Sequence, residues 1–363
     1  MSFESTNLMS IAKVVTGKHD ANHADENGQY RFYTCASEFS KCNTYNFQGE
    51  CIILPGNGAN VGDAYFYDGK FDAYQRTYVV HDIDKKRIIP KFLHYNFLHN
   101  WKTIGTAQQF GSATNYIKIG NFENYRVACP SINIQRNAIS ELDLLTEIIN
   151  KQKQQLKELD TLAQSIFYDM FGSPDANEKE WIMKSLAEIG TIVSGSTPST
   201  SDESNWDGDV NWVTPAELGV QLFYGETRRK ITSKAAKSLT IMPIGTLLMS
   251  SRAPIGKLAI TSVPMCCNQG FKNIVCGNNV NNIYLYYCLM LNINSIKAMG
   301  RGATFKEVSK QAVSSFEIML PPMNLQELFA QKILSIESQK ESINRSLAES
   351  QKLFDYTMDK YFG

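Results

Sequence analysis

The sequence lacks any run of about 18 apolar residues, the length that a membrane-spanning helix needs. Its first residues, MSFEST, have neither the basic nor the apolar region of a secretory signal peptide. The hydrophobic fraction of 43% and the charged fraction of 20% are typical of globular proteins, and 363 residues can form two domains of ordinary size. We therefore expect a cytoplasmic protein without a membrane segment.

Disulfide and metal-binding patterns are also missing. The eight cysteines show no two-residue spacing, and the adjacent Cys266 and Cys267 fit neither a zinc knuckle nor a disulfide framework. We expect reduced, mostly buried thiols. His19 and His23 lie four residues apart, but Gly28 follows and no helical pattern holds them together. We interpret both as loop residues and predict no metal site.

The chain also has no catalytic motif of a DNA-modifying enzyme. It lacks the Asn-Pro-Pro-Tyr or Asp-Pro-Pro-Tyr segment of amino-methyltransferases and the glycine-rich Walker A loop. A faint nuclease-like pattern at residues 174–179 has the wrong Glu-to-Lys spacing and lies in a polar connector. We predict a non-catalytic protein that binds no cofactor itself.

An excess of basic charge is missing as well, because 36 Lys and Arg balance 36 Asp and Glu. The charge is nevertheless uneven. Residues 181–325 carry 13 basic and 9 acidic side chains, whereas residues 135–172 carry 4 and 6. This imbalance is too weak to identify a nucleic-acid-binding protein, since phosphate contacts usually need a concentrated basic face.

What the sequence does contain is a repeat. Residues 318–363 match residues 127–172 without a gap at an offset of 191. The matched pairs include Pro130 and Pro321, Asn133 and Asn324, Gln135 and Gln326, Leu156 and Leu347, and Phe171 and Phe362. Landmarks upstream follow in the same order in both halves. A duplicated chain tends to fold with a pseudo-two-fold axis, which is also the symmetry of the duplex DNA backbone.

The repeated segments predict two long helices. In residues 135–172 apolar side chains recur alternately three and four apart, with Gln152 as the polar member. The second copy keeps this pattern with three interruptions, at Lys340, Ser350 and Thr357. A helix of about 38 residues would reach about 57 Å, so we expect the two to pair as an antiparallel coiled coil. Such a rod would separate two lobes by a distance comparable to one turn of DNA, about 34 Å.

These features divide the chain into five segments. We predict a domain at 1–134, a long helix at 135–172, a linker at 173–180, a second domain at 181–325 and a second long helix at 326–363. β-type runs at 50–54, 76–80, 246–250 and 272–275, with a helical stretch at 281–291, predict an α+β fold.

Two loops occupy the same place in the two repeats, PGNGANVG at residues 55–62 and SSRAPIG at residues 250–256. Such loops can bring backbone groups and short polar side chains close to a phosphate or a base edge. The second half adds SGSTPSTS at 194–201 and a basic cluster at 228–230. Each of these segments also fits an ordinary surface loop.

With these segments the sequence resembles the specificity subunits of type I restriction-modification systems over essentially its whole length. The resemblance is carried by LAEIGTIVSGSTP (186–198), GDVNWVTPAEL (208–218), residues 252–269, GATFKEVSK (302–310), LPPMNLQ (320–326) and, in the first half, residues 49–80. The motifs are specific in this order and in duplicate. The first half departs from the pattern, because Lys18-His19-Asp20 stands where the second half has Ser196-Thr197-Pro198.

The resemblance implies two target-recognition domains, each reading one half of a bipartite, asymmetric duplex DNA sequence in the major groove, with the helices setting the gap. It implies two methyltransferase subunits docked on the helices and lobes, and motor-nuclease subunits that join for restriction. S-adenosylmethionine, ATP and Mg²⁺ would be bound by those partners. The complex would direct adenine N6-methylation and restriction.

Side-chain chemistry then selects the DNA contacts that we predict. They are Asn57, Asn60 and Arg76 in the first domain and Thr197, Arg252, Lys272 and Thr304 in the second. Arg76 and Lys272 fit phosphate contacts as well as base contacts. Trp206 and Trp212 fit either a core or a stacking role.

Two other functions fit part of the sequence. A coiled-coil assembly protein could present two protein-binding lobes, but the duplicated turn motifs fit it less well. A specificity portion of a fused restriction enzyme is disfavoured by the missing catalytic motifs.

Overall fold

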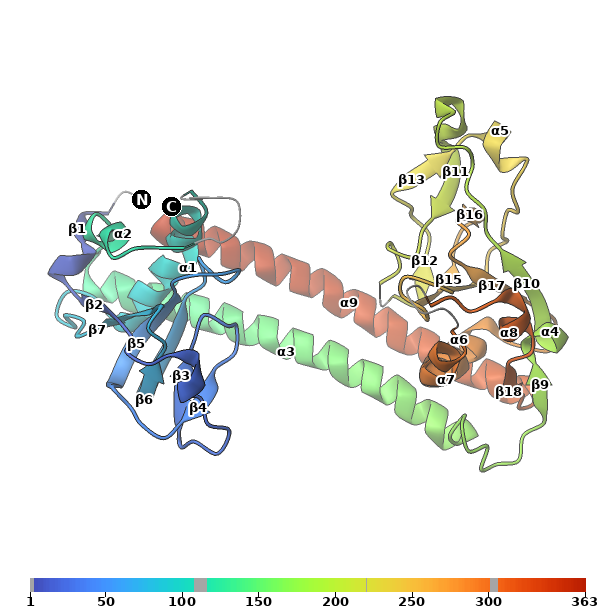
Figure 1. The fold of residues 1–363 in the computed structure, drawn as a ribbon, viewed down its shortest axis with the longest axis horizontal. Coiled ribbons are helices and arrows are strands. Elements are labelled where there is room, and N and C mark those ends of the chain that lie inside the picture. Colours follow the sequence, from blue (N-terminus) through green and yellow to red (C-terminus); the bar gives the residue numbers. More distant parts are fainter. Residues whose placement is uncertain (1–2, 108–115, 220, 301–305) are drawn as a thin grey trace. The chain divides into compact units, whose positions relative to one another are not determined.

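The computed structural model describes residues 3–107, 116–219, 221–300 and 306–363 and contains two compact units (Figure 1). Unit 1 comprises Met1–Gln154 and Asn344–Gly363, and unit 2 comprises Gln155–Ile343. The unit boundaries cut through both long helices, so each helix contributes residues to both units. None of the helices in the described part of the chain is long and apolar enough to cross a membrane.

Unit 1 is built on a six-stranded sheet in the order β2-β7-β5-β6-β3-β4. The strands are β2 (Lys13–Thr16), β3 (Tyr30–Tyr33), β4 (Ser40–Cys42), β5 (Phe47–Pro55), β6 (Tyr65–Ala73) and β7 (Thr77–His81). Neighbouring strands are antiparallel except β3 and β6, which are parallel. Both faces of β5 are buried. Ile52 and Leu54 face the main core of the unit, whereas Cys51 and Ile53 face a second, aromatic cluster.

Helices cover one face of this sheet. They are α1 (Pro90–Ala107), α2 (Gly120–Glu123) and the short turn η1 (Leu8–Ser10). A second short turn, η2 (Ala21–His23), follows β2, and β1 (Ser5–Asn7) pairs with β8 (Arg126–Ala128). Phe92, Phe97 and Trp101 of α1 are completely buried in the main core. The end of the chain closes this core, because the rings of Phe92 and Phe362 lie 4.8 Å apart.

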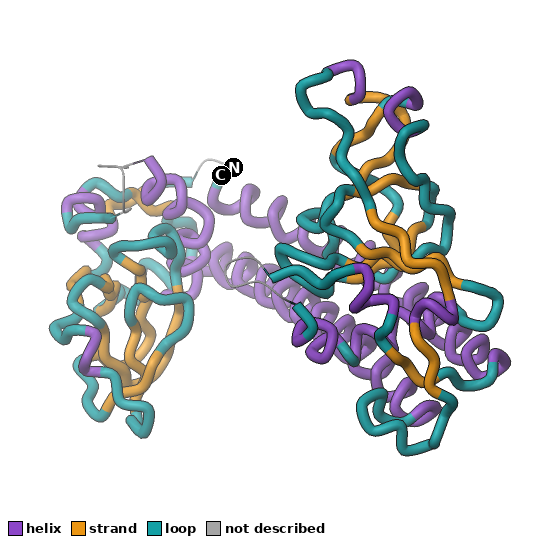
Figure 2. The backbone as a smooth tube through the Cα atoms, turned by 45° about the vertical axis from the view of Figure 1, so that its right-hand side comes forward, coloured by secondary structure: helices purple, strands orange, loops and turns teal. Residues whose placement is uncertain are grey.

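Unit 2 contains a five-stranded sheet (β10-β17-β14-β15-β12), a three-stranded sheet (β13-β11-β16) and the pair β18-β9 (Figure 2). The strands are β9 (Met183–Ser185), β10 (Gly190–Ser194), β11 (Trp206–Val213), β12 (Phe223–Tyr224), β13 (Arg229–Ile231), β14 (Leu247–Met249), β15 (Leu258–Thr261), β16 (Met265–Cys267), β17 (Lys272–Cys276) and β18 (Glu317–Met319). The helices are α4 (Leu186–Ile189), η3 (Glu203–Asn205), α5 (Ser233–Ala236), α6 (Asn282–Leu291), α7 (Ile293–Ala298) and α8 (Lys310–Ser314). The predicted α+β class is confirmed, and the β-type runs and the helical stretch predicted from the sequence all fall on observed elements.

The two long helices are α3 (Ile132–Phe171) and α9 (Met323–Phe362), each of 40 residues. Each begins three residues before the predicted start, at 132 rather than 135 and at 323 rather than 326. Residues with higher numbers in α3 contact residues with lower numbers in α9. The contacts are Glu141–Lys360 and Gln152–Ser346 in unit 1, and Asp160–Lys340 and Phe167–Phe329 in unit 2. The helices therefore pair antiparallel within each unit, as predicted.

The polar residues that interrupt the apolar pattern have partners across or along the helices. Lys340 forms ion pairs with Asp160 and Glu337, both at 2.8 Å, and its side chain is 17% exposed. Burial opposes the charged form of Lys340, but these hydrogen bonds outweigh burial and raise its pKa. The hydroxyls of Ser350 and Thr357 donate to backbone carbonyls one turn earlier. The interruptions are therefore compatible with a continuous helix pair.

The repeated glutamine at each helix start has a structural reason. Gln135 is fully buried. Its Oε1 accepts a hydrogen bond from the Ile89 backbone N–H at 2.8 Å, and its Nε2 donates to the carbonyls of Arg87 (2.9 Å) and Pro130 (2.8 Å). The side chain thus ties the start of α3 to the segment that leads into α1.

Gln326 repeats this arrangement in unit 2. Its Oε1 accepts from the Asn281 N–H at 2.8 Å, and its Nε2 donates to the carbonyls of Pro321 (2.7 Å) and Asn279 (3.4 Å). Asn281 is the N-cap of α6, so Gln326 ties the start of α9 to the start of α6, as Gln135 ties the start of α3 to the segment that leads into α1. We call Gln135 and Gln326 the helix-entry glutamines. They show that the repeat in the sequence is a repeat in the fold.

The linker caps the end of α3. Gly172 adopts a left-handed conformation (φ +80°), which favours glycine, and its N–H bonds to the Tyr168 carbonyl at 2.8 Å. The ammonium of Lys179 donates to the carbonyls of Asp169 (2.6 Å) and Met170 (3.0 Å). The last carbonyls of the helix are therefore satisfied by the linker itself.

All eight cysteines are free in the structure, and five of them are buried, as predicted for mostly buried thiols. Burial raises the pKa of Cys51 and Cys267 to about 12 and that of Cys266 to about 11. These thiols are protonated at neutral pH, a state that is neither nucleophilic nor metal-binding.

Candidate nucleic-acid interface

Three loops of unit 1 meet at the end of β5. The Gly56 N–H donates to the Arg76 carbonyl at 2.9 Å, and the Cys35 thiol donates to the same carbonyl at 3.3 Å. Asn60 Nδ2 donates to the Cys35 carbonyl at 2.8 Å. A Cβ at Gly56 would lie 2.2 Å from the Arg76 carbonyl oxygen, so only glycine permits this approach. The residues predicted in the first domain are thus brought together.

The three predicted residues of unit 1 differ in how free their side chains are. The Arg76 side chain is exposed, and no ion pair involving it occurs among the residues that the structure describes. Asn57 is half-buried and forms an isolated backbone bridge with Tyr116. Asn60 is half-buried, and its amide group holds the loop through Cys35. Arg76 and Asn57 are therefore better placed for a ligand than Asn60, which has a structural role.

The bridge to Tyr116 also adds a cation that the sequence patterns did not single out. The Ile117 N–H donates to the Gly56 carbonyl at 2.9 Å, which fixes this segment beside the loop of residues 55–62. Lys118 follows immediately, is exposed and places its Nζ 5.4 Å from the Tyr116 ring centroid. No motif surrounds Lys118 in the sequence, so only the fold reveals it.

In unit 2 the equivalent loop at residues 250–256 is closed by its own hydroxyl. Ser250 Oγ donates to the Pro254 carbonyl at 2.7 Å and accepts from the Lys257 N–H at 2.8 Å. The Ser251 N–H donates to the Gly270 carbonyl at 2.8 Å, and the Ser251 carbonyl accepts from the Val308 N–H at 3.0 Å. The loop is thereby held between β17 and the segment before α8.

Arg252 and Lys272 share one carboxylate. Glu307 lies 3.9 Å from Arg252 Nη1 and 3.3 Å from Lys272 Nζ. The Lys272 side chain is only 10% exposed, whereas that of Arg252 is 37% exposed. The ammonium of Lys272 faces Glu307 and Ser251. Among the predicted contacts Lys272 is thus the one that its position least favours, while Arg252 remains at the surface.

Thr197 lies on an exposed loop that two tryptophans hold in place. Its hydroxyl donates to Gln269 Oε1 at 2.5 Å. The indole N–H of Trp212 donates to the Ser196 carbonyl and that of Trp206 to the Ser199 carbonyl, each at 3.2 Å. Both rings belong to a buried cluster, so the core role left open by the sequence is the observed one.

The basic cluster at residues 228–230 is partly structural. The Arg229 guanidinium lies 3.6 Å from the Trp206 ring centroid, a cation–π contact. Glu217 accepts hydrogen bonds from the Arg228 N–H (2.7 Å) and from both the N–H and the hydroxyl of Thr214. This network joins β11 to the basic cluster and explains the Thr-Pro-Ala-Glu segment of the sequence.

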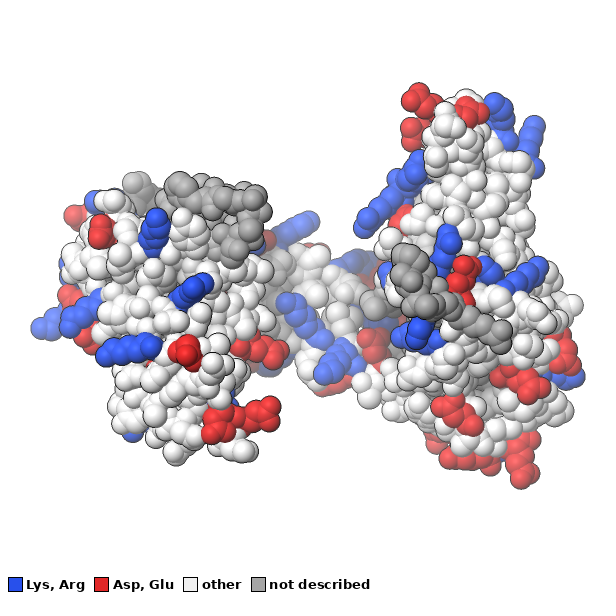
Figure 3. All heavy atoms as spheres, in the orientation of Figure 1, with Lys and Arg blue, Asp and Glu red and all other residues white. Residues whose placement is uncertain are grey.

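A groove of about 920 Å³ lies between these segments in unit 2. Its lining includes Arg252 and three residues outside the predicted set, Asn268, Lys297 and Lys306. In the face that Figure 3 shows, acidic side chains gather around the linker and β9, whereas basic side chains project near β13. Thr304, the remaining predicted contact, lies outside the described residues. The groove therefore combines backbone turns, an amide and three cations with the carboxylate of Glu307; backbone groups, amides and cations are the groups that contact phosphates and base edges.

The comparisons with known proteins agree with this arrangement. The sequence matches the family described as type I restriction modification DNA specificity domain over residues 2–159 and again over residues 178–349. The type I restriction enzyme MjaIX specificity subunit of Methanocaldococcus jannaschii is 39% identical over 158 residues, 42% of this chain and 37% of the relative. The EcoDI specificity subunit of Escherichia coli is 36% identical over 159 residues, 44% of this chain and 34% of the relative. These matches span about a third of each relative's length.

A solved structure shows the same fold. The S subunit of a type I restriction-modification system from M. genitalium has a TM-score of 0.66 and 15% identity, covering 100% of this chain and 96% of that chain. The family pattern occurs in both halves of the sequence, and each unit carries an equivalent loop cluster and an equivalent helix start. The chain therefore belongs to the family of type I restriction modification DNA specificity domains, of which it contains two.

Proposed function

We propose that this chain is the non-catalytic DNA-recognition subunit of a type I restriction-modification complex. Each unit would read one half of a bipartite, asymmetric duplex sequence in the major groove. The observation that carries the proposal is the duplication of one DNA specificity domain in a single chain, each copy with its own cluster of polar loops. A protein that recognises one continuous DNA sequence needs one such domain, whereas a protein that recognises two separated half-sites needs two.

The proposed base and phosphate contacts are the predicted residues, ranked by the freedom of their side chains. Arg76 and Asn57 in unit 1, and Thr197 and Arg252 in unit 2, are supported by their exposed or half-exposed positions. Asn60 and Lys272 would act by holding their loops, and Thr304 remains a proposed contact. We add three lysines as phosphate contacts. Lys118 follows the segment that is bridged to Asn57, and Lys297 and Lys306 line the groove together with Arg252.

We further propose that the long helices set the distance between the two half-sites. Helices of 40 residues extend about 60 Å, which exceeds one turn of DNA, about 34 Å. The partners would be two methyltransferase subunits and motor-nuclease subunits. S-adenosylmethionine, ATP and Mg²⁺ would be bound by those subunits, which would carry out adenine N6-methylation and restriction.

The test is single-molecule sequencing of DNA from cells that carry this gene with a neighbouring methyltransferase gene, compared with cells that lack only this gene. The proposal expects modified adenines in a split motif of two short half-sites with a fixed gap, and loss of this modification on deletion. Unchanged methylation with the partners expressed would refute the proposal. It would favour a coiled-coil assembly protein that presents two protein-binding lobes.

A further inference from the structure

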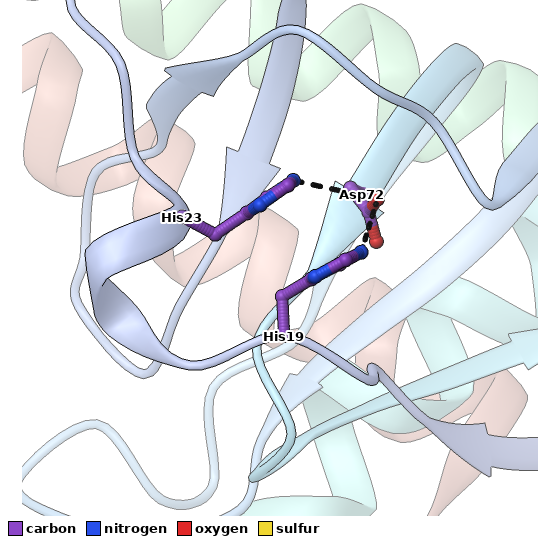
Figure 4. A group of neighbouring side chains, drawn as sticks. All are labelled: His19, His23 and Asp72. Carbon is purple, nitrogen blue, oxygen red and sulfur yellow. Dashed lines mark ion pairs between the residues drawn. The ribbon is translucent and has the colours of Figure 1, made fainter.

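Three side chains that can ligate a metal ion meet in unit 1, and none of them is among the predicted DNA contacts. His19 follows β2, His23 ends η2 and Asp72 lies on β6, and their rings and carboxylate point toward one another (Figure 4). The three ligand atoms all lie within 4.8 Å of one another. The Asp72 side chain is fully buried, whereas those of His19 and His23 are 35% and 22% exposed. A cation therefore has access from solvent past the imidazole rings.

The distance from His19 to Asp72 is close to that of two ligands around one cation, and His23 lies somewhat farther away. His19 Nε2 lies 3.4 Å and His23 Nε2 3.9 Å from Asp72 Oδ2, longer than an ordinary hydrogen bond of about 2.7–3.2 Å. Two ligands bound to one tetrahedral Zn²⁺ at about 2.0–2.1 Å would lie roughly 3.3 Å apart. The two imidazole rings are stacked, with centroids 3.7 Å apart and an interplanar angle of 7°. Because the in-plane lone pairs of two parallel rings cannot meet at one point, at least one of the two imidazoles would turn when an ion binds.

The hydrogen bonds around Asp72 place Oδ2 on the side of the two histidines, where it accepts from Asn46 and Thr44. The Ala73 N–H donates to Oδ1 at 2.8 Å, which leaves Oδ2 toward the histidines. Asn46 Nδ2 donates to Oδ2 at 2.8 Å and lies 3.3 Å from His19 Nε2. Because an amide N–H₂ group only donates, the contact with His19 is a hydrogen bond only in the tautomer whose Nε2 is unprotonated. This is the tautomer that binds a metal ion.

Thr44 stands where a fourth ligand belongs. Its Oγ1 donates to Asp72 Oδ2 at 3.1 Å and therefore accepts the 2.8 Å hydrogen bond from the Nε2–H of His23, a proton that a metal ion would displace. A cation would replace this hydrogen bond, with the Thr44 hydroxyl or a water molecule as the fourth ligand. The buried carboxylate of Asp72 would then be neutralised by a positive charge rather than by hydrogen bonds alone.

We propose that His19, His23 and Asp72 form a site for one divalent transition-metal ion, for which Zn²⁺ is the best match because it prefers tetrahedral nitrogen and oxygen ligands. The role of the ion is structural. The Gln75 N–H donates to the His19 carbonyl at 2.8 Å, directly before Arg76. A bound ion would therefore fix the loop between β2 and β3 against β6, beside the segment that carries Arg76.

The experiment measures Zn²⁺ binding to the full chain after removal of metals, by titration against a chromogenic chelator and by thermal unfolding. His19→Ala and His23→Ala remove one ligand each at partly exposed positions. His99→Ala is the matched control, because His99 faces a single carboxylate, Asp359, at 3.5 Å without a third ligand. Asp72→Asn keeps the volume of the buried side chain; if it fails to fold, the two histidine variants decide the outcome.

We expect the wild-type chain and His99→Ala to bind one equivalent of Zn²⁺. His19→Ala and His23→Ala should lose this binding, with a fall in Zn²⁺ affinity larger than the roughly 10–100-fold that follows from a change outside the ligands themselves. Zn²⁺ at about 100 times its dissociation constant should raise the unfolding midpoint of only the first two proteins, by roughly 5–10 °C. The Co²⁺ derivative should show visible d–d bands without thiolate charge-transfer bands, which separates this site from the cysteines. Equal binding by all the variants, or no binding by the wild-type chain, would overturn the proposal. No readout involves DNA or partner subunits, so the result is independent of the proposed function.

Discussion

Replacing Gln135, the first helix-entry glutamine, tests the structural reason for the repeat. Gln135→Ala removes three hydrogen bonds of 2.8, 2.9 and 2.8 Å from a fully buried side chain. At about 1 kcal/mol for each bond, the free energy of unfolding should fall by about 3 kcal/mol. For a unit of this size the unfolding midpoint should fall by roughly 6–12 °C. Urea and thermal denaturation followed by circular dichroism measure both quantities.

Two further variants separate hydrogen bonding from packing. Gln155→Ala changes an exposed glutamine of the same helix and should alter stability by less than about 0.5 kcal/mol. Gln135→Glu fills the same volume but places a carboxylate oxygen against the carbonyls of Arg87 and Pro130, so it should be at least as damaging as the alanine variant. The reasoning is refuted if Gln135→Ala behaves like Gln155→Ala. It is also refuted if Gln135→Glu is tolerated, because packing alone would then explain the loss.

Three other predictions follow from charges and contacts. Burial lowers the pKa of His94 to about 4, and its Nε2 lies 3.1 Å from the Ala64 carbonyl. Because His94 binds a proton at a higher pH in the unfolded chain, the free energy of unfolding should fall by up to about 3 kcal/mol as pH drops from 6.5 to 4. Denaturation of His94→Gln across this pH range should show less of this loss. Lys340→Met should lower the free energy of unfolding in urea by roughly 1–3 kcal/mol, because it leaves the carboxylate of Glu337, which is 20% exposed, without its ammonium partner. Glu337→Met should lower it less, because Lys340 keeps Asp160 as a partner; equal effects of the two substitutions would argue against this account of the helix pair. Arg76→Ala should reduce the salt dependence of binding to the methylated motif by about one unit of slope, while Arg136→Ala, an exposed position on α3, should not; fluorescence anisotropy across a salt series distinguishes them.

The sequence by itself determined the features that depend on local patterns. The repeat at an offset of 191 located both long helices and both helix-entry glutamines, because a repeat can be found in the sequence without knowing which segments are in contact in the fold. Three-four spacing of apolar residues indicated the faces by which α3 and α9 pair. Glycine and proline marked the loop clusters and the end of α3 at Gly172. The α+β class and the two-domain organisation were therefore predictable.

Only the tertiary structure decided which side chains are free. Lys272 and Arg252 carry the same charge in the sequence, yet Lys272 is nearly buried on β17 against Glu307 while Arg252 stays at the surface. Arg229 looked like part of a basic patch, but it stacks on Trp206. Lys297 and Lys306 enter the groove because elements distant in sequence fold together.

The histidine and aspartate cluster shows the physical reason most clearly. His19 and His23 are near in sequence and carried no metal prediction, because the spacing lacked a helix to align them. Asp72 comes from β6, which pairs with β3 and β5 through contacts distant in sequence. Local spacing encodes helices, turns and amphipathic faces, whereas the meeting of three ligands depends on sheet order and register, which are set by long-range pairing.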